Sequence, residues 1–184
     1  MPLAESTMLE LGTQAPDFAL TDVTTGKEVR RGDFSGKALL VMFICTHCPY
    51  VKHIEKTLGK LGRDYAGKPL AIVAISSNDA DNYPDDRPEG LKAQAQANGF
   101  TFPYLYDEGQ AVARAYKAAC TPDLYLFDAG HKLVYRGQYD SSRPGNGIPV
   151  TGEDLRAAMD AVLAGRPISK DQRPSIGCNI KWKG

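Results

Sequence analysis

Two unbroken apolar runs mark the centre of the predicted sheet. Residues 38–44 read A-L-L-V-M-F-I, and residues 70–75 read L-A-I-V-A-I. Both runs are short and rich in strand-forming residues, which is the pattern of parallel strands covered on both faces. The sequence therefore predicts two buried strands that lie close together in one sheet.

A helix is predicted after each of the two apolar runs. Apolar side chains recur three to four positions apart after the first run, at Val51, Ile54, Leu58 and Leu61. This spacing predicts a helix over residues 49–65, and Pro49 suits its first turn. A second helix is predicted over residues 91–97, where Asn98 and Gly99 would end it. The alternation predicts a strand-helix-strand-helix unit.

The second half of the chain predicts smaller elements. They are a short edge strand, a short helix and two hairpin strands, at residues 104–106, 110–118, 124–127 and 132–136. A last helix is predicted to end at Leu163, with Thr151 as its N-cap and Asp154 completing a near capping box. Together these elements predict an α/β fold, a mixed sheet with helices on both faces.

Composition sets limits on the class of protein. The chain has 184 residues, of which 42% are hydrophobic, so it can bury the core of one domain without disulfide bonds. We expect one domain over residues 1–184, with its core at about 11–164. Basic and acidic residues number 22 each, which gives no general attraction to nucleic acid or to an anionic membrane. No signal-like start or membrane-length apolar run occurs, so we expect a cytoplasmic protein.

The candidate chemistry lies where the first apolar run ends. Residues 43–50 read F-I-C-T-H-C-P-Y, which places Cys45 and Cys48 at a strand-to-helix junction. A helix N-terminus stabilises a thiolate, the species that attacks disulfides. We predict that Cys45, ahead of the helix, is an exposed thiolate of low pKa, and that the shielded Cys48 closes the internal disulfide. His47 would supply a positive charge or a hydrogen bond to the thiolate.

These features together resemble the thioredoxin superfamily, in which C-x-x-C at a helix start is paired with a distant Thr-Pro, here Thr121-Pro122. The stretch L-G-T-Q-A-P-D-F-A-L at residues 11–20 is similar to the N-terminal hairpin of the branch that contains peroxiredoxins (alkyl hydroperoxide reductase and thiol-specific antioxidant types) and membrane-anchored thiol-disulfide reductases. T-H-C-P-Y-V-K-H and P-S-I-G-C-N-I-K-W resemble a group of bacterial peroxiredoxin-like proteins.

The resemblance implies a thioredoxin-like fold with an N-terminal hairpin extension and an extended C-terminal tail. It also implies a cis Thr121-Pro122 bond that faces the cysteines, with Thr46, His47 and Pro49 supporting them. The backbone ahead of the proline would then be free to pair with an extended substrate, so the implied partners are protein or peptide disulfides. An unidentified thiol or reductase would donate the electrons.

Two departures from the family matter. Peroxiredoxins carry P-x-x-x-T/S-x-x-C, but the proline and threonine positions before Cys48 hold Val41 and Cys45, which argues against fast peroxide reduction. Thioredoxins carry a buried acid on the strand before the motif and a tryptophan before the first cysteine, whereas this strand is apolar throughout. Proton transfer would therefore fall to Glu55, His47 or water.

We therefore predict a thiol-disulfide oxidoreductase that uses Cys45 and Cys48 and needs no cofactor or metal. One alternative is a peroxiredoxin-like peroxidase with Cys48 as the peroxide-reactive cysteine. The other is a metal-binding or redox-sensing module. A structural zinc site usually needs a second cysteine pair, which the chain lacks. Copper delivery would need His131 near the cysteines, whereas it and His53 have the pattern of surface residues.

Two further segments are candidates for the site. Residues 76–90 follow the second buried strand and carry five acidic residues against one arginine, so we predict a loop at the site rim. The acidic residues would either favour basic partners or simply form a solvated loop. In the tail at 165–184, apolar Ile176, Cys178, Ile180 and Trp182 alternate with other residues, which predicts a docked segment. Docking would bring Cys178 near Cys120 as a second thiol pair. The competing interpretation is two unrelated cysteines buried for packing.

Overall fold

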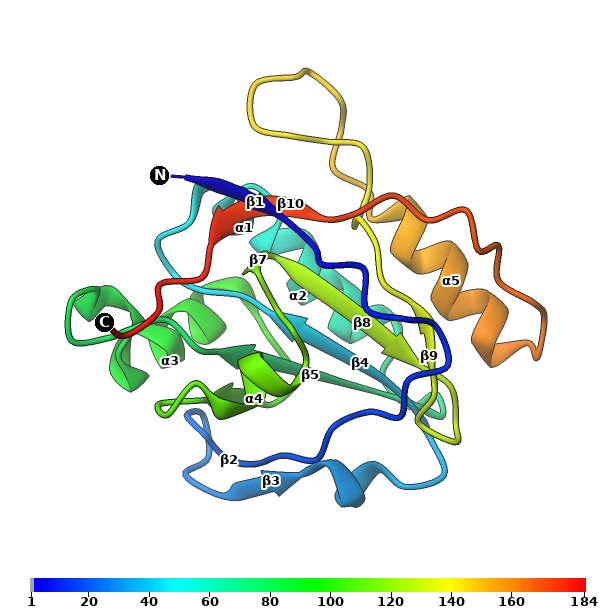
Figure 1. Cartoon of the computed structure of the whole chain (residues 1–184), viewed down its shortest axis with the longest axis horizontal. Helices are drawn as coiled ribbons and strands as arrows, with labels where there is room; N and C mark the ends of the chain where they lie inside the picture. The colour runs from blue at the N-terminus through cyan, green and yellow to red at the C-terminus, as the bar shows by residue number, and fades with distance from the viewer. Residues whose placement is uncertain (1) are drawn as a thin grey trace.

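A seven-stranded mixed sheet forms the centre of the computed structural model, which describes residues 2–184 (Figure 1). Its strand order is β3-β2-β6-β5-β4-β8-β9. The strands are β2 (Ala19–Asp22), β3 (Glu28–Arg30), β4 (Ala38–Phe43), β5 (Leu70–Ser76), β6 (Tyr104–Tyr106), β8 (Asp123–Phe127) and β9 (Leu133–Tyr135). β4, β5 and β6 pair in parallel, and the remaining pairs are antiparallel. The predicted mixed α/β sheet is confirmed.

The N-terminal hairpin explains one wrong prediction. β2 and β3 pair with each other, and β2 also pairs with β6. β6 is therefore an interior strand and not the predicted edge strand. The hairpin extends the sheet beyond the strand-helix-strand unit, as the family resemblance implied.

Hydrophobic clusters cover both faces of the sheet. Along β4, Leu40 and Met42 join one cluster, while Leu39, Val41 and Phe43 join the other, as the alternation of side chains along a strand requires. The helices are α1 (Pro49–Lys52), α2 (Glu55–Asp64), α3 (Pro88–Asn98), α4 (Ala111–Ala115) and α5 (Glu153–Leu163), with 3-10 turns η1 (Arg31–Phe34) and η2 (Pro84–Asp86). Side chains of α1, α2, α3 and α5 belong to the first cluster, and those of α4 to the second.

The two helices predicted after the buried strands agree with the structure only in part. The helix expected over residues 49–65 is divided into α1 and α2, and at the break the Ile54 N–H bonds to the Val51 carbonyl, three residues back. The helix predicted over residues 91–97 begins earlier, at Pro88, and ends at Asn98, where the expected Gly99 has the left-handed conformation (φ 64°) that glycine tolerates.

The start of α5 differs from the predicted cap. Gly152, with φ 71°, is the N-cap in place of Thr151. The carboxylate of Asp140 accepts hydrogen bonds from the backbone N–H groups of Thr151 and Gly152, each at 2.8 Å. Asp154 accepts from Gln138 Nε2 at 2.7 Å and completes no capping box. A side chain from outside the helix therefore satisfies the donors that the local sequence was expected to satisfy.

A second, three-stranded sheet holds the C-terminal tail. Its order is β1-β10-β7, formed by β1 (Leu3–Glu5), β10 (Ile176–Asn179) and β7 (Cys120–Thr121). In Figure 1 the red strand of the tail runs beside the blue N-terminal strand. β10 is antiparallel to both neighbours. The tail thus reaches the segment that carries Thr121-Pro122.

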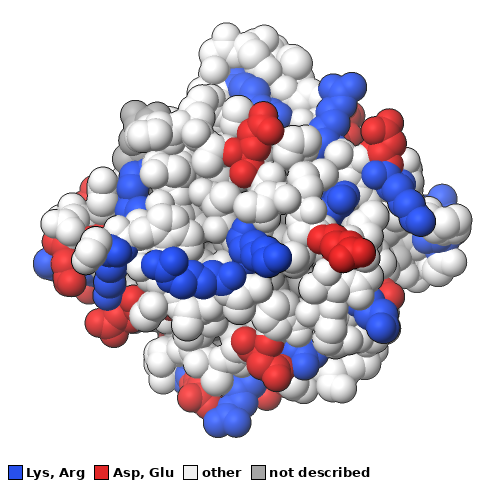
Figure 2. Space-filling view, in the orientation of Figure 1, with Lys and Arg blue, Asp and Glu red and all other residues white. Residues whose placement is uncertain are grey.

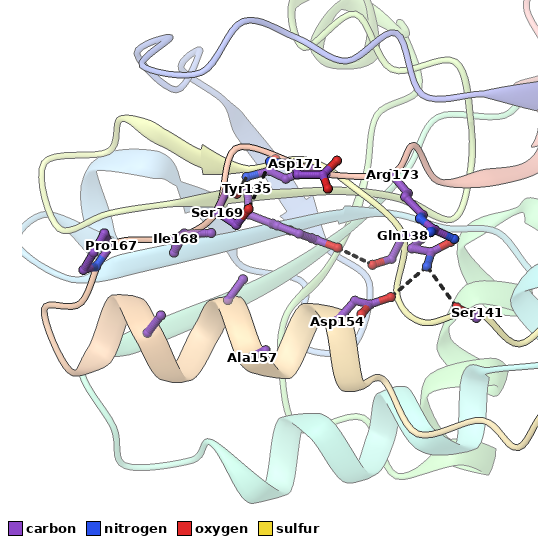
Figure 3. Close-up of a pocket in the computed structure, with 13 residues that line it drawn as sticks. Tyr135, Gln138, Ser141, Asp154, Ala157, Pro167, Ile168, Ser169, Asp171 and Arg173 are labelled. Carbon is purple, nitrogen blue, oxygen red and sulfur yellow. Dashed lines mark hydrogen bonds between the residues drawn. The ribbon is translucent and has the colours of Figure 1, made fainter.

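The first half of the tail is anchored beside α5. A groove of about 480 Å³ lies between α5 and residues 167–173, and Figure 3 shows Tyr135, Gln138 and Asp154 along it. The Gln172 side chain bonds the tail to residues of β9 and just after it. Its Nε2 donates to the Val134 carbonyl at 3.0 Å, and its Oε1 accepts from Arg136 Nη1 at 2.8 Å. These contacts fix the path of the chain toward β10.

Charges of both signs are mixed on one face of the molecule. On the face drawn in Figure 2, basic and acidic side chains are interspersed, which agrees with equal totals of 22. Within residues 2–184, no helix has the length and apolar character to cross a membrane.

We predict that Gly59→Ala destabilises the protein. A Cβ at Gly59 in α2 would overlap the backbone carbonyl of Asn98 at the end of α3. Alanine normally stabilises a helix interior, but forced overpacking costs about 1–3 kcal/mol, so the midpoint of urea unfolding should fall.

The matched control is Gly32→Ala, because a Cβ at Gly32 meets nothing within 4 Å. Its unfolding midpoint should stay close to that of the wild type. An equal or higher midpoint for Gly59→Ala would contradict the close approach of α2 and α3.

Candidate functional site

Cys45 and Cys48 lie in the turn between β4 and α1. Cys48 is the N-cap of α1 and Pro49 is its first residue. Both thiols are buried, with 1% of Cys45 and none of Cys48 exposed. The prediction of an exposed Cys45 is therefore wrong.

The Thr121-Pro122 segment faces both cysteines. Its peptide bond is cis, as the family resemblance implied. Thr121 Oγ1 lies 3.4 Å from Cys45 Sγ, and the Thr121 carbonyl oxygen lies 3.4 Å from Cys48 Sγ. One residue from a distant part of the chain thus contacts both sulfur atoms.

The two thiols differ in their tendency to ionise. A hydrogen bond from Cys45 lowers the pKa of Cys48, and further hydrogen bonds from Cys178, Thr121 and the backbone N–H of Val51 act in the same direction against the effect of burial. The pKa of Cys45 is raised by its hydrogen bond to Cys48, by burial and by the negative charge of Asp86. These influences favour ionisation of Cys48 over ionisation of Cys45.

This order reverses the assignment predicted from the sequence. The prediction placed Cys45 at the positive end of a long helix, but α1 has four residues and Cys48 is its cap. The individual N–H of Val51 therefore acts on Cys48. Asp86, which lies 41 residues after Cys45 in the sequence, supplies a negative charge that raises the pKa of Cys45.

Asp86 organises the turn between the cysteines. Its Oδ1 accepts from Thr46 N at 2.8 Å and Thr46 Oγ1 at 2.6 Å, and its Oδ2 accepts from Asn78 Nδ2 at 3.0 Å. His47 Nδ1 lies 2.7 Å from Asp86 Oδ2, and the His47 ring stacks on Tyr83 with 5.3 Å between centroids. Burial opposes ionisation of Asp86, but the bonds from His47, Thr46 and Asn78 outweigh it and hold its pKa below the usual value.

Sequence reasoning placed residues 76–90 at the rim of the site but did not single out Asp86. The available signal was the position of this loop after β5, next to the end of β4. Two of the acids in the loop, Asp79 and Asp86, are buried and bonded internally. The acidic surface expected to favour basic partners is therefore reduced to Asp81, Asp85 and Glu89.

Glu55 reaches the cysteines only indirectly. Gln94 Nε2 donates to the Cys45 carbonyl at 2.9 Å and to Glu55 Oε2 at 3.0 Å. Tyr104 OH donates to Gln94 Oε1 at 2.7 Å. Gln94, which the sequence analysis missed, therefore connects Glu55 to the backbone at Cys45, and Asp86 is the acid next to the thiols.

The side chains of the other two cysteines do not face each other. In the register of β10 with β7, Cys178 is opposite Thr121, and Cys120 is opposite Asn179. Because successive side chains of a strand alternate, Cys120 and Cys178 project from opposite faces. Cys178 belongs to the same buried cluster as Cys48, whereas Cys120 Sγ donates to the Pro122 carbonyl at 3.5 Å. Burial raises the pKa of Cys120 strongly and that of Cys178 to about 12.

The backbone edge beside the cis proline is occupied. The expectation that Thr121 is free to pair with an extended substrate is wrong, because β10 already pairs with it. A partner strand would have to displace the tail to bind there.

Three side chains at the site have the chemistry of metal ligands. The ligand atoms of Cys45, His47 and Asp86 all lie within 4.8 Å of one another. A structural zinc site has four ligands, so this set falls one short. His131 is not part of it: its Nε2 contacts the carbonyl oxygens of Phe34 and Lys37, at the opposite end of β4. The arrangement expected for copper delivery is therefore not found.

Comparison with known proteins identifies one family and two very similar structures. A family model described as AhpC/TSA family matches residues 11–136. An uncharacterized conserved protein from Geobacillus kaustophilus is 59% identical, with 100% of this chain and 97% of that chain covered and a TM-score of 0.97. A hypothetical protein from Sinorhizobium meliloti 1021 is 51% identical, with 98% of each chain covered and a TM-score of 0.95.

More distant proteins have names that state an activity. Thiol-disulfide oxidoreductase ResA of Bacillus thuringiensis (strain Al Hakam) is 26% identical over 131 residues, 71% of each chain. The thioredoxin domain of a thiol-disulfide oxidoreductase from Bacteroides vulgatus is 23% identical, with 84% of this chain and 99% of that chain covered and a TM-score of 0.66. The second likeness shows a shared thioredoxin-like fold.

We predict that Asp86→Asn makes Cys45 more reactive. The substitution removes a negative charge that raises the pKa of Cys45, so the fraction of Cys45 thiolate at a given pH should increase. Alkylation of the native protein with iodoacetamide, mapped by mass spectrometry from pH 6 to 9, should show Cys45 labelled several-fold faster, with its pH profile moved to lower pH.

Asp85→Asn is the matched control, because Asp85 is an exposed neighbour in the same 3-10 turn. It should leave the labelling of Cys45 unchanged. Equal profiles for Asp86→Asn and the wild type would show that the Asp86 charge does not act on this thiol.

Proposed function

Because the chain belongs to the AhpC/TSA family, whose model matches residues 11–136, we propose that it is a thiol-disulfide oxidoreductase that uses Cys45 and Cys48. It is a peroxiredoxin-like member of the thioredoxin superfamily. One observation carries the proposal: two buried thiols in the turn after β4 both contact Thr121, the residue before the cis proline. The ResA relatives support the same chemistry.

The reaction begins at Cys48. Its thiolate attacks one sulfur of a substrate disulfide, forms a mixed disulfide and releases the other sulfur as a thiolate. Cys45 then loses its proton and attacks Cys48 Sγ, which closes the Cys45–Cys48 disulfide and releases the second substrate thiolate. Two electrons pass from the dithiol to the substrate, and an external thiol reductant returns them.

Supporting residues have separate tasks in this scheme. The ligand atoms of Asp86 and His47 lie within 4.8 Å of Cys45 Sγ, so these side chains are the candidates to accept its proton. Thr46 fixes Asp86 through two hydrogen bonds, and Pro49 begins α1 directly after Cys48.

We also propose that residues 1–184 act as one domain, in which residues 165–184 are a docked tail. Protein disulfides are the proposed substrate class.

A peroxidase is the second candidate, because Cys48 has the lowered pKa that a peroxide-reactive cysteine needs. Attack on the peroxide O–O bond would give a sulfenic acid and release water or an alcohol, and Cys45 would then displace hydroxide, which leaves as water. Rapid consumption of hydrogen peroxide by Cys45→Ser would favour this candidate. Metal retained by the wild type through chelation would instead favour a metal-binding role for Cys45, His47 and Asp86.

We predict that Cys48→Ser lowers dithiothreitol-driven reduction of insulin on the order of a hundredfold or more, because it removes the attacking thiolate. Turbidity of the released insulin B chain measures the rate. Cys120→Ser is the control, since Cys120 projects away from the other thiols, and its rate should match the wild type. A Cys48→Ser rate equal to that of the wild type would refute the assignment.

A further inference from the structure

β10 occupies the position beside Thr121 that an extended substrate would use. Cys178 is the residue paired with Thr121. Gly177 makes this close approach possible, because a Cβ at that position would overlap the Thr121 carbonyl oxygen. The tail therefore presents a cysteine to the site in the way that a bound peptide would.

Three thiols converge on Thr121. Its side chain lies 3.4 Å from Cys45 Sγ and its carbonyl oxygen 3.4 Å from Cys48 Sγ. Residues paired across two strands share a face, so the Cys178 side chain is on the face of the Thr121 side chain. All three cysteines belong to one buried cluster, in which 2% of Cys178 is exposed.

Contacts on both sides of β10 hold Cys178 in place. Before it, Ser175 Oγ donates to the Gly137 carbonyl at 2.8 Å. After it, Lys181 N donates to Asn78 Oδ1 at 2.8 Å, and the Arg114 guanidinium lies over the Trp182 ring at 4.4 Å. A thiol fixed in this way has a high effective concentration toward a neighbouring sulfur.

We propose that Cys178 is a third redox-active thiol, which competes with Cys45 for the disulfide bond to Cys48. The proposal extends the proposed function, because it takes Cys48 as the central sulfur of the exchange. It assigns the tail a chemical role in place of simple packing, and it leaves Cys120 outside the exchange.

The exchange is balanced in atoms and electrons. When the Cys45–Cys48 disulfide is present, the Cys178 thiolate attacks Cys48 Sγ, the Cys48–Cys178 bond forms, and Cys45 leaves as a thiolate that takes up the proton lost by Cys178. No electrons leave the protein in this step. Cys178 can equally resolve a mixed disulfide at Cys48 and release the substrate thiolate. Either route covalently ties the tail to the site in the oxidised protein.

The test uses variants that retain two thiols each. Cys45→Ser/Cys120→Ser retains Cys48 and Cys178, and after oxidation with stoichiometric diamide it should contain an intramolecular Cys48–Cys178 disulfide in most molecules. Cys120→Ser/Cys178→Ser should close Cys45–Cys48. Cys45→Ser/Cys48→Ser, which retains Cys120 and Cys178, should close no intramolecular bond. Non-reducing peptide mapping by mass spectrometry identifies each linkage.

A glycine variant tests the role of strand position. Gly177→Ala in the Cys45→Ser/Cys120→Ser background should slow formation of the Cys48–Cys178 bond several-fold, because the added Cβ forces β10 away from Thr121. Gly32→Ala in the same background should leave the rate unchanged. Equal rates for the two glycine variants would overturn the argument from strand position.

The outcomes separate this proposal from the proposed function. Closure of Cys45–Cys48 without any Cys48–Cys178 linkage in the partner variant overturns the role of Cys178 and leaves thiol-disulfide exchange intact. Failure of both linkages overturns both. Far-ultraviolet circular dichroism checks the fold of each variant. If a variant does not fold, mapping of the oxidised wild type decides: a Cys48–Cys178 peptide supports the proposal, and its absence at every diamide ratio overturns it.

Discussion

The packing of Thr121 against two sulfur atoms is the contact on which the site depends. Thr121 approaches Cys45 with its hydroxyl and Cys48 with its carbonyl oxygen. The same residue is an end of the short strand β7, which gives the tail an edge to pair with. The positions of the thiols, the cis proline segment and the C-terminal strand are therefore set by a single local arrangement.

Asp86 places a buried negative charge beside the cysteines, although β4 itself carries no acidic residue. All six residues of β4 are buried and apolar. The carboxylate comes from the loop after the adjacent parallel strand, where Thr46 and Asn78 bond to it and His47 lies beside it. A buried carboxylate stays ionised only with such partners. Together with the neighbouring Cys48 and burial, its charge raises the pKa of Cys45.

The docked tail restricts the access of substrates to the cysteines. Cys45, Cys48 and Cys178 are exposed by 1%, 0% and 2%, and β10 covers the edge beside Thr121. A protein disulfide can reach Cys48 only if part of this cover moves. Contacts of Gln172 and Ser175 anchor the chain before β10, and contacts of Lys181 and Trp182 anchor it afterwards.

The sequence by itself determined the elements whose signals are local. The apolar runs of β4 and β5, the end of α3 at Gly99 and the C-x-x-C at a strand end follow from neighbouring residues. Tertiary structure decided what depends on distant residues: Asp140 bonds to the start of α5 in place of the expected cap, the charge of Asp86 adds to the burial that raises the pKa of Cys45, and strand register places Cys178 on the face of Thr121 and away from Cys120. Periodicity predicts which face of an element is buried, but a carboxylate or a thiol acts only over a few ångströms, and those distances are set when the chain folds.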